Sequence, residues 1–391
     1  MVKDVFKILT LNNISTQGLA RFPRDRYELA TETLYPDAVL LRSFQMHDMV
    51  FPATLKAVGR AGAGVNNIPV EKLSKLGIPV FNAPGANANA VKELVIAGML
   101  LACRNICNAW RFSTALTGDD AAIHQQVENG KKQFVGIELP GRTLGVIGLG
   151  AIGRLVANAA LDLGMNVIGY DPGLTVQGAW KLSSKVEQAR GVEDLVARSD
   201  FISLHVPLRE NTQHLINTDI LRRMKQGAVV LNFAREGIVD EDAVVAAIHE
   251  QKLRAYVCDF PSNKMQNHAN IIALPHLGAS TLEAEDNCAI MVADALRDYL
   301  ENGNIKNSVN FPEVDMARCE AFRISIVNAN VPNMVGQIST ALAKAGLNIC
   351  DMLNKSKGEI AYTVVDLDST VPAVVIQEIG RIAGVLAVRA I

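Results

Sequence analysis

Short apolar runs alternate with amphipathic helical stretches through most of the chain. The run Ala38-Val39-Leu40-Leu41 is typical of a strand, and the stretch from Val70 to Leu76 is typical of a helix. Strands that alternate with helices indicate a parallel sheet with helices on both faces. The pattern therefore predicts an α/β fold.

Two such alternating series follow one another. The first is expected to place strands at 6–10, 38–41, 55–58 and 79–82, and a long helix from 89 to about 116. The second is expected to place strands at 144–147, 166–170, 201–205, 228–232, 255–259 and 270–273. About six strands form a full dinucleotide-binding sheet. A long helix at 281–302 is expected to cross back to the first domain and to make that domain discontinuous.

The segment from 317 to 391 changes to a different pattern. Strands are expected at 322–327, 348–353, 360–367 and 385–391, with helices at 334–345 and 371–381. This βαββαβ order is the ferredoxin-like pattern. The sequence thus predicts two doubly wound, Rossmann-like parallel-sheet domains, at 1–95 with 285–312 and at 96–284, followed by a ferredoxin-like domain at 317–391.

Composition narrows the classes of function. Hydrophobic residues make up 49% of the chain and charged residues 20%, so a large core can be buried. The net charge of -2 and the lack of a basic run give no case for binding nucleic acid or an anionic membrane. The longest apolar run, from Leu94 to Cys103, is too short to span a bilayer. The start has no signal-peptide pattern and the six cysteines form no CxxC pair, so we expect no metal site and a cytoplasmic location.

A glycine fingerprint follows the first strand of the second series. Gly148 permits a tight turn, Gly150 lets the backbone approach a pyrophosphate, and Gly153 allows close packing of helix and strand. Ala151 and Ile152 open the helix, whose N terminus favours phosphate groups. The alternative is that these glycines only form the turn and bind no nucleotide.

Asp171 ends the next strand, 18 residues after Gly153. Its carboxylate is placed to accept hydrogen bonds from the hydroxyls of an adenosine ribose, and its charge would repel a 2′-phosphate. The predicted cofactor is therefore NAD rather than NADP. The alternative is a carboxylate that only ends the strand.

Arg235 and His276 are the candidate catalytic residues. Oxidation of a secondary alcohol needs a base for the hydroxyl proton, and histidine is suited to that role near neutral pH. His276 follows the last strand of the second series, and Arg235 follows the strand at 228–232, at the edge where ligands bind in doubly wound folds. An arginine binds a substrate carboxylate through two parallel hydrogen bonds. A surface arginine and a histidine that caps a turn are the alternatives.

Arg42 and Arg60 follow strands of the first series, so both should lie at the carboxyl edge of the first sheet. Two cations at that edge suit a dianionic substrate. The alternative is a pair of solvated arginines.

Four stretches together resemble the D-2-hydroxyacid dehydrogenase family. They are the loop 59–67, the glycine fingerprint, the stretch 224–235 and the stretch 274–281, in the order and spacing of the family. The resemblance is strongest to members that carry a C-terminal ACT domain. It implies NAD-dependent oxidation of 3-phospho-D-glycerate to 3-phosphohydroxypyruvate, the first step of phosphorylated serine biosynthesis.

The resemblance also assigns residue roles. It implies that His276 is the acid-base group and that Arg235 orients the substrate carboxylate and carbonyl. The implied cofactor contacts also include Pro207, Ala234, Asp259 and Gly278, and the implied substrate contacts also include Ser43, Ala61, Gly62, Ala63, Gly64 and Asn87.

One departure from the family concerns the catalytic histidine. The family usually has a Glu that holds this histidine, in a stretch of the form D-V-F-x-x-E-P, whereas the corresponding residues 258–264 contain only Asp259 as a carboxylate. Asp259 is therefore expected either to take part in catalysis in place of the Glu or to contact the nicotinamide amide.

The tail resembles an ACT domain, a domain that pairs edge to edge and binds small amino acids at the seam. Asn328 and Asn330 lie in its first loop and Asn348 begins its second strand, and carboxamides offer both donors and acceptors to a zwitterion. The expected effector is L-serine, and the expected assembly is a homodimer or homotetramer. An apolar dimer face without a ligand is the alternative.

Two other functions remain open at this point. One is a dehydrogenase for glycerate, glyoxylate or lactate-like acids, against which the two arginines and the ACT-like tail argue. The other is a corepressor-like NAD sensor, against which the presence of both Arg235 and His276 argues.

Overall fold

The computed structural model describes residues 5–319 and 322–391. The chain divides into two compact units, Met1–Asn87 with Leu282–Ile391, and Ala88–Thr281. The divisions lie a few residues before the domain boundaries expected from the sequence, and the functional domains themselves remain a prediction.

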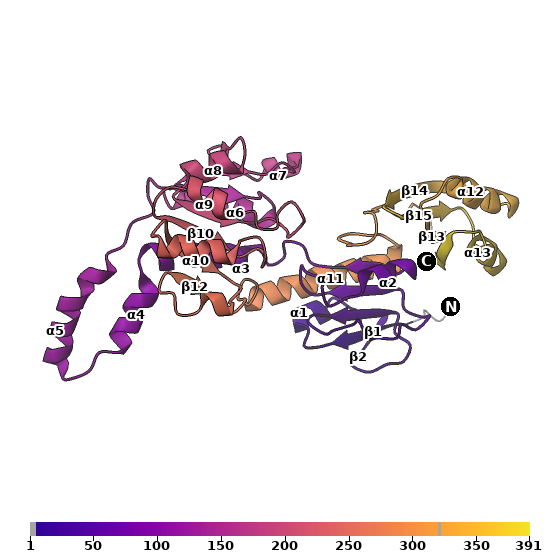
Figure 1. Ribbon diagram of the computed structural model, residues 1–391. Coiled ribbons are helices and arrows are strands. Elements are labelled where there is room, and N and C mark those ends of the chain that lie inside the picture. Colours follow the sequence, from indigo (N-terminus) through magenta and orange to yellow (C-terminus); the bar gives the residue numbers. More distant parts are fainter. Residues whose placement is uncertain (1–4, 320–321) are drawn as a thin grey trace. The chain divides into compact units, whose positions relative to one another are not determined.

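The first unit contains a parallel five-stranded sheet in the order β2-β1-β3-β4-β5 (Figure 1). Its strands are β1 (Phe6–Leu11), β2 (Tyr27–Ala30), β3 (Ala38–Leu41), β4 (Ala57–Arg60) and β5 (Val80–Phe81). Its helices are α1 (Thr16–Leu19), α2 (Val70–Lys75) and α11 (Leu282–Asn302). Helix α11 packs so closely on β4 that a Cβ on Gly59 would lie 2.5 Å from Val292. This contact brings the helix at 282–302 into the first unit.

Two strands of this sheet differ from the prediction. Strand β2 was not expected, because it lies at the edge of the sheet and its central residues Glu28 and Leu29 are exposed, which removes the apolar signal. Strand β4 begins two residues after the predicted start at Leu55, because the N–H of Leu55 donates to Pro52 O at 3.0 Å in the preceding turn.

The tail forms an antiparallel four-stranded sheet in the order β14-β15-β13-β16. Its elements are β13 (Phe322–Ala329), α12 (Met334–Lys344), β14 (Ile349–Lys357), β15 (Ile360–Leu367), α13 (Ala373–Gly380) and β16 (Val385–Ala390). The predicted βαββαβ order is confirmed.

The second unit contains a parallel seven-stranded sheet in the order β12-β11-β10-β9-β6-β7-β8. Its strands are β6 (Thr143–Ile147), β7 (Asn166–Tyr170), β8 (Glu187–Gln188), β9 (Phe201–Leu204), β10 (Ala228–Asn232), β11 (Leu253–Cys258) and β12 (Ile271–Ala273). Its helices include α3 (Ala88–Cys103), α6 (Ala151–Asp162), α7 (Val176–Ala179), α8 (Val192–Arg198), α9 (Thr218–Arg223) and α10 (Glu241–His249). The doubly wound fold is confirmed, with one short strand, β8, beyond the expected six.

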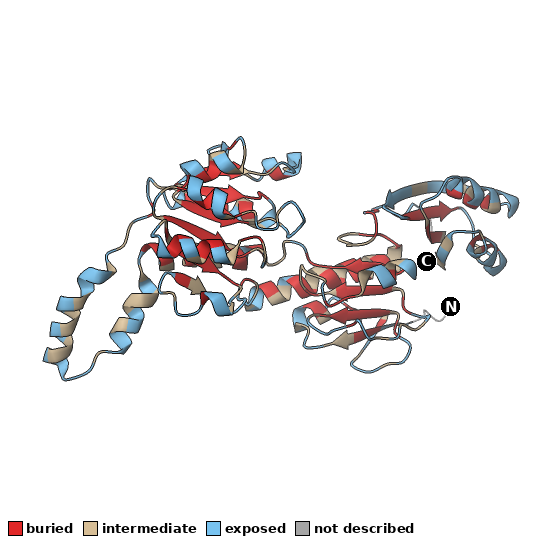
Figure 2. Ribbon diagram, in the orientation of Figure 1, coloured by how far each residue is buried: buried red, intermediate tan, exposed pale blue. Residues whose placement is uncertain are grey.

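The sheet of the second unit has a separate hydrophobic core on each face. The buried strands and the helix sides that face them appear red in Figure 2. The strand order reverses between β6 and β9, which is where doubly wound sheets bind ligands.

The prediction of one long helix from 89 to about 116 is wrong. Asn105 has a φ of 53°, a left-handed conformation that ends α3 and lets α4 (Ile106–Thr114) begin in a new direction. Helix α5 (Asp120–Gly130) and a 3-10 turn (Lys131–Phe134) follow, and none of these three elements has a buried residue. We call residues 106–134 the arm; it extends away from the sheet of its unit (Figure 1).

The described part of the chain contains no helix with the length and apolarity that crossing a bilayer requires.

Candidate active site

The turn between β6 and α6 requires glycine at two of its three fingerprint positions. Gly148 has a φ of +92°, and a Cβ there would lie 2.5 Å from the carbonyl oxygen of His205. A Cβ on Gly153 would lie 1.9 Å from the carbonyl oxygen of Gly148. A Cβ on Gly150, in contrast, would have no heavy atom within 4 Å. The backbone at Gly150 is therefore open beside the N terminus of α6, as the approach of a pyrophosphate requires.

Asp171 lies directly beside this turn. One of its carboxylate oxygens accepts a hydrogen bond from the N–H of Leu149 at 2.8 Å, and the other accepts one from Gly173 at 2.8 Å. A carboxylate oxygen can accept more than one hydrogen bond, so both remain able to bind ribose hydroxyls. The structure thus brings Asp171 and the glycine turn together.

His205 is a half-buried residue at the same turn. Its Nε2 lies 2.8 Å from the Ser203 hydroxyl, while Nδ1 is buried without a hydrogen-bond partner in the described residues. Burial lowers the pKa of His205 to about 4. This imidazole is therefore neutral at physiological pH.

Arg235 lies in an exposed loop that a buried asparagine holds in place. The side chain of Asn232, at the end of β10, donates to the carbonyl of Arg235 at 3.0 Å and accepts from the N–H of Ala234 at 3.2 Å. Within the described part of the chain, the guanidinium donates only to the adjacent carbonyl of Ala234. Its remaining donors are thus available to a substrate carboxylate.

His276 is exposed and adopts a left-handed conformation with φ of 55°. Its ring packs edge-on against Phe260, with ring centroids 5.2 Å apart. Among the described residues, no side chain forms a hydrogen bond to its imidazole.

Asp259 is 2% exposed and binds the loop that follows this histidine. Its two carboxylate oxygens accept from the N–H groups of Leu277 and Gly278, each at 2.7 Å. The carboxylate therefore acts on the backbone of the His276 loop rather than on its imidazole. The adjacent thiol of Cys258 is protonated, because burial raises its pKa to about 11.

The predicted residues of the second unit follow consecutive strands at the carboxyl edge of its sheet. Strand β6 is followed by Gly148, β7 by Asp171, β9 by Pro207, β10 by Ala234, β11 by Asp259 and β12 by Gly278. The candidate catalytic residues lie after β10 and β12, on either side of Asp259. This edge therefore collects every predicted cofactor and catalytic residue.

The first unit places its two candidate arginines side by side. Arg42 follows β3 and Arg60 ends β4, and the Arg60 Nε donates to the carbonyl of Arg42 at 3.1 Å. Arg42 also forms an ion pair with Glu285 of α11, at 2.7 Å. The pair of cations predicted at this edge is thus present, with one carboxylate beside it.

The predicted substrate loop lies next to these arginines. Ala61 donates its N–H to Leu41 O at 2.8 Å, Gly62 O accepts from Ala83 at 3.0 Å, and Asn82 binds Ala63 O at 2.5 Å. Ser43 is held by the side chain of Asn12, which accepts its N–H at 3.1 Å. Gly64 ends the loop, and Asn87 is half-buried at the end of the unit's first segment.

The three candidate effector residues do not meet within one chain. Strand register pairs Asn328 with Ala361 near the end of β13, whereas Ile349, next to Asn348, pairs with Leu367 at the opposite end of the sheet. The side chain of Asn330 donates to Gly358 O at 3.0 Å. The Oδ1 atom of Asn328 is buried without a partner among the described residues.

Several residues that support the site were not identified from the sequence. Asn12 and Asn232 each follow or end a strand, and that position is a local signal that could have revealed them. Glu285 has no such signal, because its partner Arg42 lies far away in the sequence.

Comparisons with known proteins show the family of the chain. Residues 96–278 match the family described as D-isomer specific 2-hydroxyacid dehydrogenase, NAD binding domain. The chain is 37% identical over 319 residues to D-3-phosphoglycerate dehydrogenase of Methanocaldococcus jannaschii, a match that covers 80% of this chain and 57% of that protein. It is 33% identical over 347 residues to D-3-phosphoglycerate dehydrogenase of Haemophilus influenzae, covering 86% of this chain and 81% of that protein.

Solved structures show the same fold. NAD-bound 3-phosphoglycerate dehydrogenase of Entamoeba histolytica is 25% identical with a TM-score of 0.60, covering 78% of this chain and 98% of that chain. D-2-hydroxyisocaproate dehydrogenase is 23% identical with a TM-score of 0.64, covering 78% of this chain and 100% of that chain.

Proposed function

Because the chain belongs to the D-isomer specific 2-hydroxyacid dehydrogenase family, we propose that it oxidises 3-phospho-D-glycerate to 3-phosphohydroxypyruvate with NAD, the first step of phosphorylated serine biosynthesis. The main support for this substrate is the match to D-3-phosphoglycerate dehydrogenases over most of the chain. The paired Arg42 and Arg60 support it, because a phosphorylated acid carries more negative charge than an unphosphorylated one.

In the proposed reaction, His276 accepts the proton of the substrate hydroxyl. The glycine turn and Asp171 would hold NAD, which would supply the acceptor for the hydride that leaves the hydroxyl-bearing carbon. The products are the ketone, NADH and a protonated His276. Arg235 binds the carboxylate through two of its donors and fixes the carbon that loses hydride. Asp259 holds the loop that carries His276, so we assign it a positioning role through the backbone in place of the missing Glu.

The choice of NAD over NADP is assigned to Asp171. Its carboxylate lies at the glycine turn, where it suits ribose hydroxyls and repels a 2′-phosphate. Replacement of Asp171 by Ala should raise the Kd of NAD with less effect on NADP. A wild-type kcat/KM with NADP equal to that with NAD would contradict this assignment.

The test of the substrate is the rate of NADH formation, measured by absorbance, with 3-phosphoglycerate, glycerate and lactate as separate substrates. We expect kcat/KM to be highest for 3-phosphoglycerate, and Arg42→Met to lower it for that substrate more than for glycerate. Preference for an unphosphorylated acid would make the chain another member of the family. Binding of NAD without turnover of any acid would make it an NAD sensor.

We further propose that the chain assembles as a homodimer or homotetramer. The arm supports this proposal, because it has no buried residue yet carries Trp110, which is 69% exposed, and Ile106, which is 43% exposed. Covering such residues requires a partner, and a second copy of the chain is the partner proposed. Light scattering should show a larger species for the wild type than for Trp110→Glu; equal masses would argue against an arm-mediated interface.

We propose L-serine as an effector that binds where two tails meet. The buried, unpartnered Oδ1 of Asn328 supports this, as does the separation of Asn328 from Asn348, because two tails are needed to bring them together. Initial rates should fall with L-serine but not with D-serine, and Asn328→Ala should weaken the response. Binding of no amino acid, measured by calorimetry, would leave the tail as an assembly module.

The proposed location is the cytoplasm. Among the described residues, Cys103, Cys107, Cys258, Cys288 and Cys319 form no disulfide, which suits a reducing compartment.

A further inference from the structure

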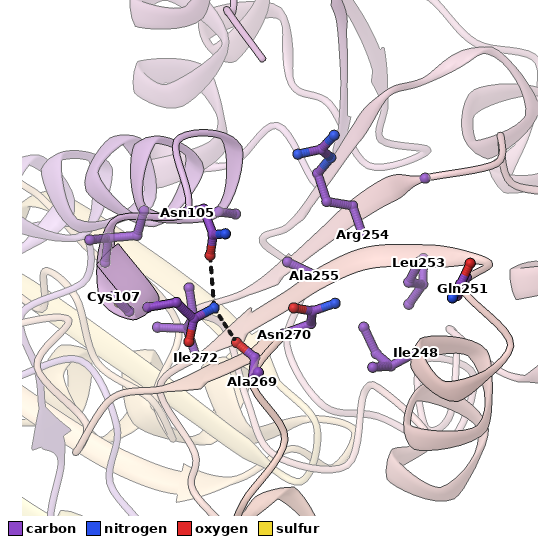
Figure 3. Close-up of a pocket in the computed structure, with 14 residues that line it drawn as sticks. Asn105, Cys107, Ile248, Gln251, Leu253, Arg254, Ala255, Ala269, Asn270 and Ile272 are labelled. Carbon is purple, nitrogen blue, oxygen red and sulfur yellow. Dashed lines mark hydrogen bonds between the residues drawn. The ribbon is translucent and has the colours of Figure 1, made fainter. Parts of the chain in front are cut away.

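A cavity of about 330 Å³ lies at the amino edge of the sheet in the second unit (Figure 3). Its lining includes Cys107 and Asn108 of the arm, so we assign the cavity to the surface that is proposed to lie between two copies of the chain. His276 follows β12, at the carboxyl edge of the same sheet. The cavity therefore has no part in holding this histidine.

The loop that carries His276 has a firmly held backbone. The N–H of His276 donates to Leu274 O at 3.0 Å, and the carboxylate of Asp259 accepts from the N–H groups of Leu277 and Gly278. The left-handed conformation of His276 is one that a non-glycine residue keeps only where its surroundings hold it. These contacts fix the direction of the Cα–Cβ bond, but they do not determine how the imidazole is rotated about it.

The contact that restricts the imidazole is with the ring of Phe260. The two ring centroids are 5.2 Å apart and the ring planes make an angle of 74°, which is a T-shaped arrangement that aromatic pairs favour. In residues 5–319 and 322–391, no side chain forms a hydrogen bond to this imidazole. The backbone of His276 and its ring are thus held by two consecutive residues, Asp259 and Phe260.

Phe260 is itself held on both sides along the chain. Its carbonyl accepts from the Cys258 thiol at 3.7 Å, and the following Pro261 restricts its backbone to extended conformations. Beyond the proline, the Ser262 hydroxyl donates to Glu241 of α10 at 2.7 Å. The ring of Phe260 is half-buried, whereas His276 is exposed. Phe260 is therefore the fixed partner of the pair, and the imidazole is the partner that needs to be fixed.

We propose, on the basis of the proposed function, that Phe260 is the residue that positions the imidazole of His276, a task for which the family usually has a Glu. Proton transfer requires an imidazole nitrogen within hydrogen-bond reach of the substrate hydroxyl, so each other rotation of the ring lowers the fraction of productive complexes. A carboxylate holds an imidazole by a hydrogen bond and stabilises its charged form. A phenyl ring holds it by contact alone, so Phe260 orients His276 without placing a negative charge beside it.

The first test is the kinetic effect of removing the ring. An aromatic pair is worth a factor of about 2 to 10 in an equilibrium, so Phe260→Leu should lower kcat with 3-phosphoglycerate by about 2- to 10-fold. The Kd of NAD, measured by calorimetry on the full chain, should not change, because the glycine turn and Asp171 are untouched. Phe260→Tyr keeps the ring and should restore kcat.

Two further measurements separate positioning of His276 from a general structural role. In the His276→Ala background, Phe260→Leu should lower kcat no further, because its effect passes through the imidazole. In the absence of substrate, diethyl pyrocarbonate should modify His276 about 2- to 10-fold faster in Phe260→Leu than in the wild type, because the ring no longer shields the imidazole. Peptide mass spectrometry measures the modification, and exposed His214 is the internal reference.

The matched control is Phe201→Leu. Phe201 is fully buried and begins β9, at the amino edge of the same sheet. This variant should lower the free energy of unfolding in urea and leave kcat and the modification of His276 unchanged. Circular dichroism establishes that each variant is folded, and Phe260→Met, which also lacks a ring, replaces Phe260→Leu if the leucine variant does not fold.

Three outcomes would overturn the proposal. The first is a Phe260→Leu enzyme with the wild-type kcat and the wild-type rate of His276 modification. The second is an equal loss of kcat in Phe260→Tyr and Phe260→Leu, and the third is the same loss from Phe260→Leu with or without His276. Failure of the wild type to oxidise 3-phosphoglycerate would instead overturn the proposed function, and modification of His276 would still test its contact with Phe260.

Discussion

At the scale of single residues, the candidate chemistry depends on His276 and Arg235, which lie at one sheet edge in the loops after β12 and β10, with β11 between them. Replacement of His276 by Ala should lower kcat by about 10²- to 10⁴-fold, the usual contribution of an acid-base group. Replacement of Arg235 by Lys keeps the charge but loses the planar fork, so KM should rise about tenfold. Steady-state kinetics measures both effects, and near-normal turnover by His276→Ala would show that another group is the base.

Asp259 offers a second test at this scale. An Asn side chain can accept from one of the two N–H groups of Leu277 and Gly278 but not from both, and leaving a buried N–H unpaired costs about 1–3 kcal/mol. Asp259→Asn should therefore lower both the free energy of unfolding in urea and kcat, since the loop that carries His276 is released.

The matched control is Asp200→Asn. Asp200 also accepts from a backbone N–H, that of Thr143 at 2.8 Å, but at the amino edge of the same sheet. This variant should lose stability without a comparable loss of kcat. If both variants keep the wild-type kcat, Asp259 has no positioning role.

The imidazole of His205, whose Nδ1 is buried, predicts a pH dependence of stability. Its pKa is about 4 in the folded state, below the ordinary value of 6.5 for an accessible histidine, so the unfolded chain takes up a proton first as pH falls. The contribution of His205 to the free energy of unfolding is therefore complete above pH 6.5. As pH falls from 6.5 towards 4, this contribution is lost, by up to about 3 kcal/mol. The difference in unfolding free energy between wild type and His205→Gln should shift by about that amount between about pH 7.5 and about pH 4.5; an unchanged difference across that range would contradict the prediction.

At the scale of elements, two glycines of the strand-turn-helix at 143–162 have different roles. Gly153 is needed for folding, and Gly150 is needed for binding NAD. A Cβ at Gly153 would overlap the carbonyl of Gly148, so Gly153→Ala should cost at least about 1–3 kcal/mol of stability. Gly150→Ala meets open space and should fold with near-normal stability, yet it should raise the Kd of NAD because the methyl group occupies the space next to the helix N terminus. Urea unfolding and calorimetry measure the two effects; equal losses of stability would refute the distinction.

At the scale of the first unit, the tail supports the structure to which it is attached. Tyr362 of β15 donates its hydroxyl to Gly303 O at 2.7 Å, and Arg323 of β13 donates to Asn302 O at 2.9 Å, so both cap the end of α11. Val327 and Ile360 belong to the same hydrophobic cluster as residues of the first sheet.

Removal of the tail after Pro312 should therefore destabilise the remaining chain. Each buried apolar side chain contributes about 1.5–3 kcal/mol, so a loss of several should lower Tm by about 5–10 °C in thermal unfolding. Asn328→Ala, which leaves these contacts in place, is the suitable control and the better variant for tests of an effector. A truncated chain with the wild-type Tm would mean that the tail folds and packs independently.

The sequence alone determined the fold class and most of the candidate site. The signals that made this possible each lie within a short segment of sequence: alternating apolar runs, a glycine turn with local steric constraints, and polar residues directly after strands. Gly148, Asp171, Arg235 and His276 could therefore be located without a structure. Edge strand β2 and the break at Asn105 were missed, because an exposed strand and a single left-handed residue leave little apolar signal.

Only the tertiary structure decided what these residues touch. Two contacts join segments that are distant along the chain: the hydrogen bonds of Asp259 to the loop after His276, and the ion pair of Arg42 with Glu285. Such contacts depend on how strands and helices pack and not on local propensity, since hydrogen bonds and ion pairs act over a few ångströms in space whatever the separation in sequence.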